Sequence, residues 1–258
     1  MKKPKIIRTA VVIPDQHFPL EDKSAVNAVL EIIKMVKPDT FINLGDVMEG
    51  SSVSAWQWKR KKRPPLEYQI PIIDKELRVV NKGIDKFDKV LDEVGCKDRY
   101  ICSGNHDEWL DAFVDQYPYM TDYTFKKACR WVERGYKYYS YNKPLKIGKL
   151  AFIHGAYTTK YHARKHLESY GLNLIYGHTH DFQRATITSL GGTQSAWSLG
   201  CLKKMDAKNN KWLKGRLHNW NHGCAIVNWH KGGNFNVEVV EIIKGVTSVW
   251  GQLIDGNK

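Results

Sequence analysis

The sequence predicts an α/β domain whose N-terminal part alternates between strands and helices. Short apolar segments rich in β-branched residues lie at 9–13, 39–44 and 99–102, as expected for buried strands. Between them, residues 24–36 and 70–94 repeat apolar side chains at helical spacing. Each of the three predicted strands ends at a cluster of Asp, His or Asn residues. This order places the clusters at the carboxyl ends of strands, where ligands collect in open α/β sheets.

Each of the first two predicted helices has one apolar face. The stripes are Val26, Val29, Leu30, Ile33 and Val36 in the first helix, and Leu77, Val80, Ile84, Phe87 and Leu91 in the second. A stripe at this spacing is typical of an amphipathic helix that packs against a core.

The rest of the chain is predicted to add a helical insertion, a second group of strands and a tail. Helices at 108–116 and 121–134 would form a small cap insertion, about 108–135, beside the strand ends. The later elements are strands at 136–141, 150–153, 172–176, 184–190, 194–199, 223–229 and 235–243, and a basic, solvent-facing helix at 160–170. We therefore expect one domain over 1–245 and a loosely held C-terminal tail over 246–258.

The composition favours a polyanionic partner. Lys and Arg number 40 against 27 Asp and Glu among 258 residues, which gives a formal net charge of +13. A surplus of this size favours contact with nucleic acid, although solubility alone would also explain it.

The cysteines and the N-terminus indicate the compartment. The five cysteines are odd in number and form no Cys-x-x-Cys pair, which argues against a disulfide framework or a thiolate zinc site. The apolar run at Ile6 and Ile7 is interrupted by Arg8, so it is too short for a signal peptide or a membrane span. We therefore expect a cytoplasmic protein without a membrane partner.

Five clusters carry residue types that bind divalent cations. They are Asp15-x-His17, Gly45-Asp46, Gly104-Asn105-His106-Asp107, His154-Gly155 and Gly177-His178-Thr179-His180. Residues two apart at a strand end can point to one face, which applies to the first and last clusters. Two Asp, four His and one Asn exceed the three protein ligands of an ordinary catalytic zinc. The set instead suits two metals about 3.5–4 Å apart that share a carboxylate. Such a pair favours in-line displacement at phosphorus, with a metal-bound hydroxide as nucleophile.

Each cluster alone is weak evidence, since an isolated Asp-x-His is usually a turn or a surface pair. All five in this order, each at a strand end, favour a catalytic site. From Asp15 to His180 their order and spacing resemble the calcineurin-like metallophosphoesterase superfamily. The resemblance implies the two-sheet α/β sandwich of that family, with the metals at the strand ends.

The resemblance also implies a role for each residue. It assigns Asp15, His17, Asp46 and His180 to the first metal, and Asp46, Asn105, His154 and His178 to the second, with Asp46 as the bridge. His106 matches the family's non-ligand histidine, which contacts the phosphate and protonates the leaving oxygen, and Asp107 would orient it. The family commonly uses manganese, iron or zinc, and manganese is our first candidate.

Two differences from protein Ser/Thr phosphatases indicate which branch of the superfamily the chain resembles. The second cluster continues as Val47-Met48-Glu49-Gly50, without the Asp-Arg of protein Ser/Thr phosphatases, and Asp107 stands where those phosphatases carry Glu. Both differences favour the phosphodiesterase and nuclease branches. The compact size and basic charge resemble small metallophosphoesterases encoded by bacteriophages.

Two basic stretches are candidates for substrate contact. Trp56, Trp58, Lys59 and Arg60 belong to a basic, tryptophan-bearing loop that leaves the sheet at the metal-bearing end, where it could attract phosphates and stack bases. A solvated loop whose tryptophans pack on the core is the alternative. The second stretch ends at His222, either a phosphate contact or a hydrogen-bonded structural histidine.

The sequence therefore predicts a metal-dependent phosphodiesterase or nuclease that acts on nucleic acid or nucleotides. One alternative is a phosphomonoesterase that acts on a small molecule or a phosphoprotein. Another is a non-catalytic accessory protein that binds nucleic acid. The aromatic-rich cap would either close over substrate or form the surface of a homodimer.

Overall fold

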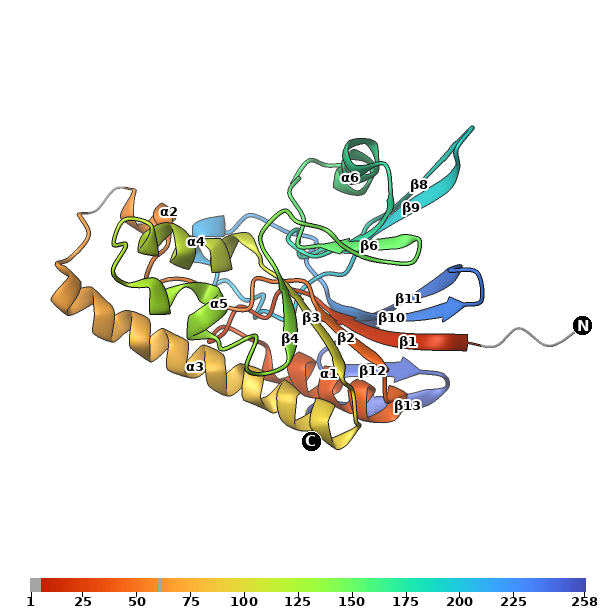
Figure 1. Ribbon diagram of the computed structural model, residues 1–258, viewed down its shortest axis with the longest axis horizontal. Coiled ribbons are helices and arrows are strands. Elements are labelled where there is room, and N and C mark those ends of the chain that lie inside the picture. Colours follow the sequence, from red (N-terminus) through yellow and green to blue (C-terminus); the bar gives the residue numbers. More distant parts are fainter. Residues whose placement is uncertain (1–5, 60–61) are drawn as a thin grey trace, which may run out of the picture.

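The computed structural model describes residues 6–59 and 62–258, and the two larger β-sheets of this part of the chain pack face to face. Helices α1 (Lys23–Val36) and α3 (Leu66–Glu93) cover the outer face of the first sheet. Helix α6 (His162–Tyr170) lies outside the second sheet, on the opposite side of the molecule (Figure 1). This arrangement confirms the predicted two-sheet α/β sandwich.

The first sheet has six strands in the order β11-β10-β1-β2-β3-β4. Its parallel strands are β1 (Ile6–Ile13), β2 (Thr40–Asn43), β3 (Asp98–Cys102) and β4 (Tyr136–Tyr139). On the other side of β1, β10 (His222–His230) and β11 (Phe235–Ile242) continue the sheet in antiparallel pairing. Because β1, β2 and β3 run in the same direction, the loops that follow them meet at one end of the sheet.

Strand β1 contributes to two hydrophobic cores. Val11 and Ile13 belong to the core beneath α1 and α3, whereas Ala10 and Val12 belong to the core between the two sheets. A strand buried on both faces carries a continuous apolar run, and this burial explains the unbroken apolar sequence at the end of β1. Asp22 caps the N-terminus of α1, where its carboxylate accepts the backbone N–H of Ala25 at 3.0 Å.

The second sheet has five strands in the order β5-β6-β7-β9-β8. They are β5 (Leu145–Ile147), β6 (Leu150–Ile153), β7 (Asn173–Tyr176), β8 (Arg184–Ser189) and β9 (Gly192–Ser198). Ala163 and Leu167 of α6 pack on the outer face of this sheet, against Leu174 and Tyr176. Strands β6 and β7 are parallel, so the loops that follow them also leave at the same end.

The predicted helical insertion is only partly helical. Helix α4 (Asn105–Val114) confirms its first helix, but the helix expected over 121–134 is wrong. That segment contains only η1 (Thr121–Tyr123) and α5 (Phe125–Ala128), and α2 (Ala55–Trp58) is a short helix before α3. Phe125 and Trp131 are fully buried with their rings 5.6 Å apart, so core packing outweighs helical continuity here. None of the helices in the described ranges is long and apolar enough to cross a bilayer.

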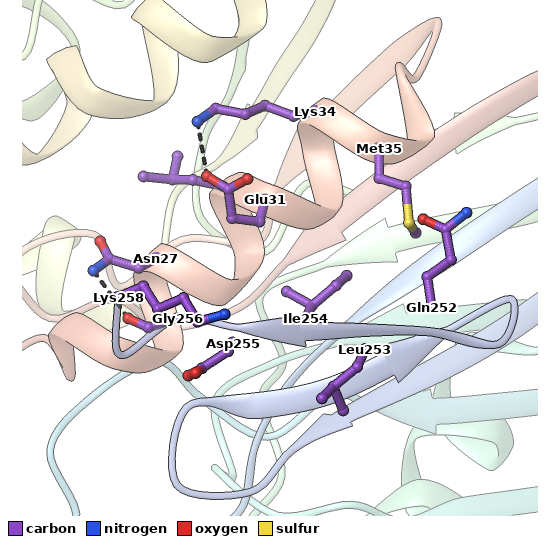
Figure 2. Close-up of a pocket in the computed structure, with 11 residues that line it drawn as sticks. Asn27, Glu31, Lys34, Met35, Gln252, Leu253, Ile254, Asp255, Gly256 and Lys258 are labelled. Carbon is purple, nitrogen blue, oxygen red and sulfur yellow. Dashed lines mark hydrogen bonds and ion pairs between the residues drawn. The ribbon is translucent and has the colours of Figure 1, made fainter.

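The loose tail expected after Gly245 is also wrong. The segment forms a hairpin of β12 (Val246–Val249) and β13 (Gln252–Asp255) that packs against α1. Val249 and Ile254 are buried in the first core. Figure 2 shows the contact, in which the side chain of Asn27 donates to the carbonyl of Gly256 at 3.1 Å. The pocket drawn there is lined by α1, β13 and the C-terminal residues, and contains none of the predicted site residues.

Candidate metal centre

All five predicted clusters lie at the carboxyl ends of strands. In the first sheet, Asp15, Asp46 and Asn105 come shortly after β1, β2 and β3. In the second sheet, His154 directly follows β6, and His178 comes shortly after β7. The two sheets are stacked with these ends together, so side chains that are far apart in the sequence converge.

The first group consists of Asp15, His17, Asp46 and His180, whose candidate ligand atoms all lie within 4.8 Å of one another. Nε2 of His17 lies 3.1 Å from Nε2 of His180 and 3.5 Å from Oδ2 of Asp46. Nε2 of His180 lies 3.4 Å from Oδ1 of Asp15. All four side chains are buried, so nitrogen and carboxylate donors face one another in a space largely screened from water.

The second group combines Asp46 with Asn105, His154 and His178. Nε2 of His154 lies 3.3 Å from Oδ2 of Asp46 and 3.0 Å from Oδ1 of Asn105. Nδ1 of His178 lies 3.2 Å from Nε2 of His154. The Oδ2 atom of Asp46 therefore faces both groups, which is the position required of a bridging ligand.

Polar contacts at Nδ1 leave Nε2 of two rings facing the centre. Nδ1 of His17 lies 2.9 Å from Oε2 of Glu49, and Nδ1 of His154 lies 2.9 Å from the carbonyl oxygen of Leu44. When Nδ1 carries the proton in such a contact, Nε2 presents its lone pair to the centre.

The backbone at the ligands is strained. Five ligands have positive φ: Asp15 at 39°, His17 at 51°, Asp46 at 47°, His178 at 70° and His180 at 63°. This region costs a non-glycine residue about 1–3 kcal/mol, and such strain concentrates at functional sites.

Two glycines make room for the carboxylates. A Cβ atom at Gly104 would lie 2.2 Å from Oδ1 of Asp46, and one at Gly177 would lie 2.0 Å from Oδ2 of Asp15. In their place, the backbone N–H groups of His106 and His178 donate to the same two carboxylates at 2.8 and 3.0 Å. The glycines are therefore part of the ligand geometry.

The charges at the centre stabilise an anionic Asp46. Burial opposes its ionisation, but nearby His154 and His106 hold the pKa of Asp46 well below its usual range. Burial also lowers the pKa of His154, yet the Asp46 and Asp15 carboxylates outweigh it and raise that pKa to about 9. For His178, burial and repulsion from His154 lower the pKa to about 3.

The donor set fits two divalent cations. A carboxylate oxygen lies between two groups of converging imidazole and carboxylate donors, and the second group adds an amide oxygen. Without a cation, His17 and His180 place two ring nitrogens 3.1 Å apart beside two buried carboxylates. Divalent cations of the manganese, iron and zinc class accept this mixture of nitrogen and oxygen ligands.

His106 lies beside the centre and outside both ligand groups. Its Nε2 is 4.0 Å from Oδ2 of Asp46, and its ring lies 4.6 Å from that of His17. Its Nδ1 lies 2.7 Å from the carbonyl oxygen of Glu49, and its other neighbour is the ring of Trp109 at 4.0 Å. The His106 side chain is therefore partly exposed, with Nε2 on the side of the candidate metal centre.

The role predicted for Asp107 needs correction. Its carboxylate accepts the backbone N–H groups of Val47 and Met48 at 3.1 and 3.2 Å, and that of Gly104 at 2.8 Å. The carbonyl of Glu49 orients His106 instead. Burial and the Asp46 charge raise the pKa of Asp107 to about 8, although the backbone donors oppose this shift. Asp107 thus ties the loop after Asp46 to the start of α4.

The comparison with known families agrees with this geometry. The model of the calcineurin-like phosphoesterase family matches residues 9–182, a range that includes every predicted metal ligand. The chain belongs to this family. Membership makes the protein a metal-dependent phosphoester hydrolase, as the sequence predicts.

The relatives of this phosphoesterase include phage proteins. The chain is 25% identical over 270 residues to the Gene 54 protein of Mycobacterium phage L5, covering 94% of this chain and 97% of the relative. It is 26% identical over 275 residues to the Gene 54 protein of Mycobacterium phage D29, with the same coverage.

Similar solved structures include a single mutant of Vps29 from Entamoeba histolytica and a dimetal phosphatase from Danio rerio. The match to the Vps29 mutant has a TM-score of 0.47 and 12% identity, and it covers 96% of this chain and 98% of the Vps29 chain. The match to the dimetal phosphatase has a TM-score of 0.45 and 11% identity, and it covers 92% of this chain and 96% of the phosphatase chain.

The predicted substrate contacts have different environments. Trp56 is 71% exposed and has the Lys59 ammonium 5.3 Å from its ring centroid. Trp58 is half-buried, and its indole N–H donates to the carbonyl of Ser52 at 3.4 Å. Arg60 lies outside the described residues. The substrate contact predicted for His222 is wrong, because this residue is buried and Nε2 lies 2.8 Å from the carbonyl oxygen of Lys203.

Glu49 and Lys203 are important residues that the sequence reasoning missed. The Glu49 carboxylate contacts Nδ1 of His17 and pairs with the buried Lys203 ammonium at 2.7 Å. Burial opposes ionisation, but His17 and Lys203 lower the pKa of Glu49 to about 2. Glu49 lies three residues after Asp46, so its nearness to the site could have been predicted from the sequence. Lys203 is 154 residues from Glu49, so its contact with Glu49 could not.

The histidines of α6, a helix predicted to face solvent, are in fact buried. His162 lies 2.5 Å from the hydroxyl of Tyr176 and 3.0 Å from a carboxylate oxygen of Asp181. Nε2 of His166 accepts the backbone N–H of Ala156 at 3.1 Å. The helix therefore anchors the loops that follow β6 and β7, which carry candidate metal ligands.

Burial of His166 predicts acid sensitivity. Burial lowers the pKa of His166 to about 4, whereas an unfolded histidine titrates near about 6.5. The unfolded chain then binds the proton more readily, so stability is lost as pH falls from about 6.5 to about 4. The expected slope from this residue is about 1 kcal/mol per pH unit. Substitution His166→Gln should flatten the pH dependence of the metal-free protein, measured by chemical denaturation between pH 7 and 5. Equal slopes in both proteins would contradict the assignment.

Proposed function

We propose that this phosphoesterase hydrolyses phosphodiester bonds in nucleic acid or nucleotides, with manganese as its metal. The observation that carries the proposal is the pairing of two ligand groups through Asp46, with the partly exposed His106 beside them. A dinuclear centre with an adjacent proton donor suits cleavage of a phosphate ester.

The loop after Asp46 supports a diester over a monoester. Protein Ser/Thr phosphatases carry Asp-Arg there, and a guanidinium suits the doubly charged phosphate of a monoester. This chain has Glu49, which pairs with His17 and Lys203, and then Gly50. A Cβ atom at Gly50 would lie 3.0 Å from the carbonyl oxygen of His106, so this position lacks space for a long side chain. A diester, with one negative charge, needs less positive charge at this point.

The chain's own residues have separable tasks. Bound divalent cations would polarise the phosphate and lower the pKa of an attacking water. Asp46 holds both ligand groups together, and Glu49 fixes the ring of His17. His106, oriented through its Nδ1 contact with the Glu49 carbonyl, can donate a proton from Nε2 to the leaving oxygen.

Nucleic acid as substrate is supported by charge and by one exposed aromatic residue. The net charge of +13 attracts polyanions, and Trp56 with Lys59 offers a stacking face beside a cation. The five cysteines are all free and buried, which supports a reducing compartment such as the cytoplasm.

The test compares four substrates with manganese and with a chelator. They are bis(para-nitrophenyl) phosphate, para-nitrophenyl phosphate, and labelled single- and double-stranded DNA. We expect manganese-dependent cleavage of the bis ester and of DNA, lost with the chelator. Cleavage of the monoester alone would favour the phosphomonoesterase. DNA binding with a steep salt dependence but no hydrolysis would favour the accessory protein.

A further inference from the structure

The loop between β9 and β10 carries three aromatic rings beside a metal ligand. The ring of Trp220 lies 4.6 Å from that of His180, in an edge-to-face arrangement. The His218 ring lies 4.5 Å from Trp220, tilted by 36°, and the Trp212 ring lies 5.9 Å from Trp220. We refer to Trp212, His218 and Trp220 as the aromatic ledge. Its rings lead from His180 of the first ligand group to the exposed Trp212 at the surface.

The ledge is exposed at its outer end and anchored at its inner end. Trp212 is 59% exposed, whereas Trp220 is half-buried. Next to Trp220, the backbone N–H of Asn221 donates to the carbonyl of His180 at 2.8 Å. The buried side chain of Asn210, directly before the η2 turn (Lys211–Leu213), donates to the carbonyl of Lys204 at 2.8 Å. The rings are thus held in place before any ligand arrives, which lowers the entropy cost of binding.

The same loop is strongly basic. Residues 204–220 contain five basic residues and one acidic residue, Asp206. The basic residues are Lys204, Lys208, Lys211, Lys214 and Arg216, of which all but the half-buried Lys204 are exposed. Several cations spread along one loop suit a ligand with several phosphates better than a single phosphate.

We propose that the aromatic ledge stacks a base of single-stranded nucleic acid next to the phosphate at the metal centre, while the basic residues hold neighbouring phosphates. The proposal rests on the phosphodiesterase function proposed above and assigns its substrate class. The edge-to-face contact with His180 places a stacked base close to the first ligand group. Because the bases of a duplex already stack on one another, only a single strand offers free base faces to Trp212.

The test measures binding of two oligonucleotides of equal length and charge. One is oligothymidylate and the other carries abasic sites throughout, so they differ only in their bases. With the metals removed by chelator, fluorescence anisotropy gives Kd for each without cleavage. We expect the wild-type protein to bind the thymidylate strand about tenfold more tightly, since each base–aromatic stack contributes on this scale. Trp212→Ala should lose most of this difference.

Trp250→Ala is the matched control, because Trp250 is similarly exposed at 56% but lies in the turn between β12 and β13. It should keep the preference for bases. If Trp212→Ala keeps it as well, or if wild type binds both strands equally, the ledge proposal is overturned. Hydrolysis of bis(para-nitrophenyl) phosphate tests the catalytic function separately. If the protein does not hydrolyse this ester but still prefers the strand with bases, the phosphodiesterase proposal is overturned and the ledge remains a binding surface.

Discussion

Asp46→Asn is expected to lower kcat/KM by about 10³-fold or more and to weaken metal binding. Oδ2 of Asp46 faces both ligand groups, at 3.5 Å from His17 and 3.3 Å from His154. The amide of Asn has the same shape but lacks the negative charge that offsets two cations. Loss of metal-ion assistance costs several kcal/mol of transition-state stabilisation. Kinetics on the bis ester and metal content by elemental analysis measure the two effects.

The matched control is Asp98→Asn, at the other end of the first sheet. Asp98 starts β3 and pairs with Arg8 and Lys137. This variant also loses one carboxylate but should keep two metals and wild-type activity. If Asp46→Asn retained both metals and full kcat/KM, Asp46 would not be the bridging ligand.

His106→Ala is expected to lower kcat by about 10²–10⁴-fold on a nucleic acid substrate while metal content stays at the wild-type level. The residue lies outside both ligand groups, with Nε2 4.0 Å from Oδ2 of Asp46. The loss should be smaller on bis(para-nitrophenyl) phosphate. Nitrophenolate is a good leaving group and needs little protonation, whereas the alkoxide that leaves from DNA needs a proton. A comparison of the two substrates therefore separates proton donation from phosphate binding.

Two further variants serve as controls for the proton-donor role of His106. Alanine leaves a space beside Trp109, whose ring contacts His106 at 4.0 Å, so His106→Asn serves as a second, better-filling substitution. His230→Ala removes a histidine from the far end of β10 and should have wild-type kinetics. Equal losses on both substrates would indicate a phosphate-binding role for His106 instead of proton donation. Loss of metal from His106→Asn would show that His106 acts as a ligand.

The convergence of the candidate metal ligands could be predicted because their signal is local. Asp15, Asp46 and Asn105 each follow an apolar strand within a few residues. In a sheet with parallel strands, that position alone decides which end of the molecule a side chain occupies. Short apolar runs rich in β-branched residues and the apolar faces of helices then predicted the α/β class and most of the element boundaries.

Contacts between residues distant in sequence decided the rest. His222 follows a basic stretch, yet its ring nitrogen Nε2 contacts the carbonyl oxygen of Lys203. Asp107 follows His106 directly, but a helix turns successive side chains by about 100°, and its carboxylate reaches the loop after Asp46 instead. The hairpin after Gly245 became visible only through its packing on α1.

The sequence by itself therefore determined the fold class and the family of this phosphoesterase, and predicted the candidate metal ligands. Each depends on residue type and on position relative to the nearest strand. Only the tertiary structure decided which groups orient those ligands, as Glu49 and Leu44 do for His17 and His154. It alone also decided which aromatic side chains, such as Trp220, lie beside the metal centre. The physical reason is that hydrogen bonds and ring contacts depend on distances of a few ångströms, which the packing of the two sheets sets.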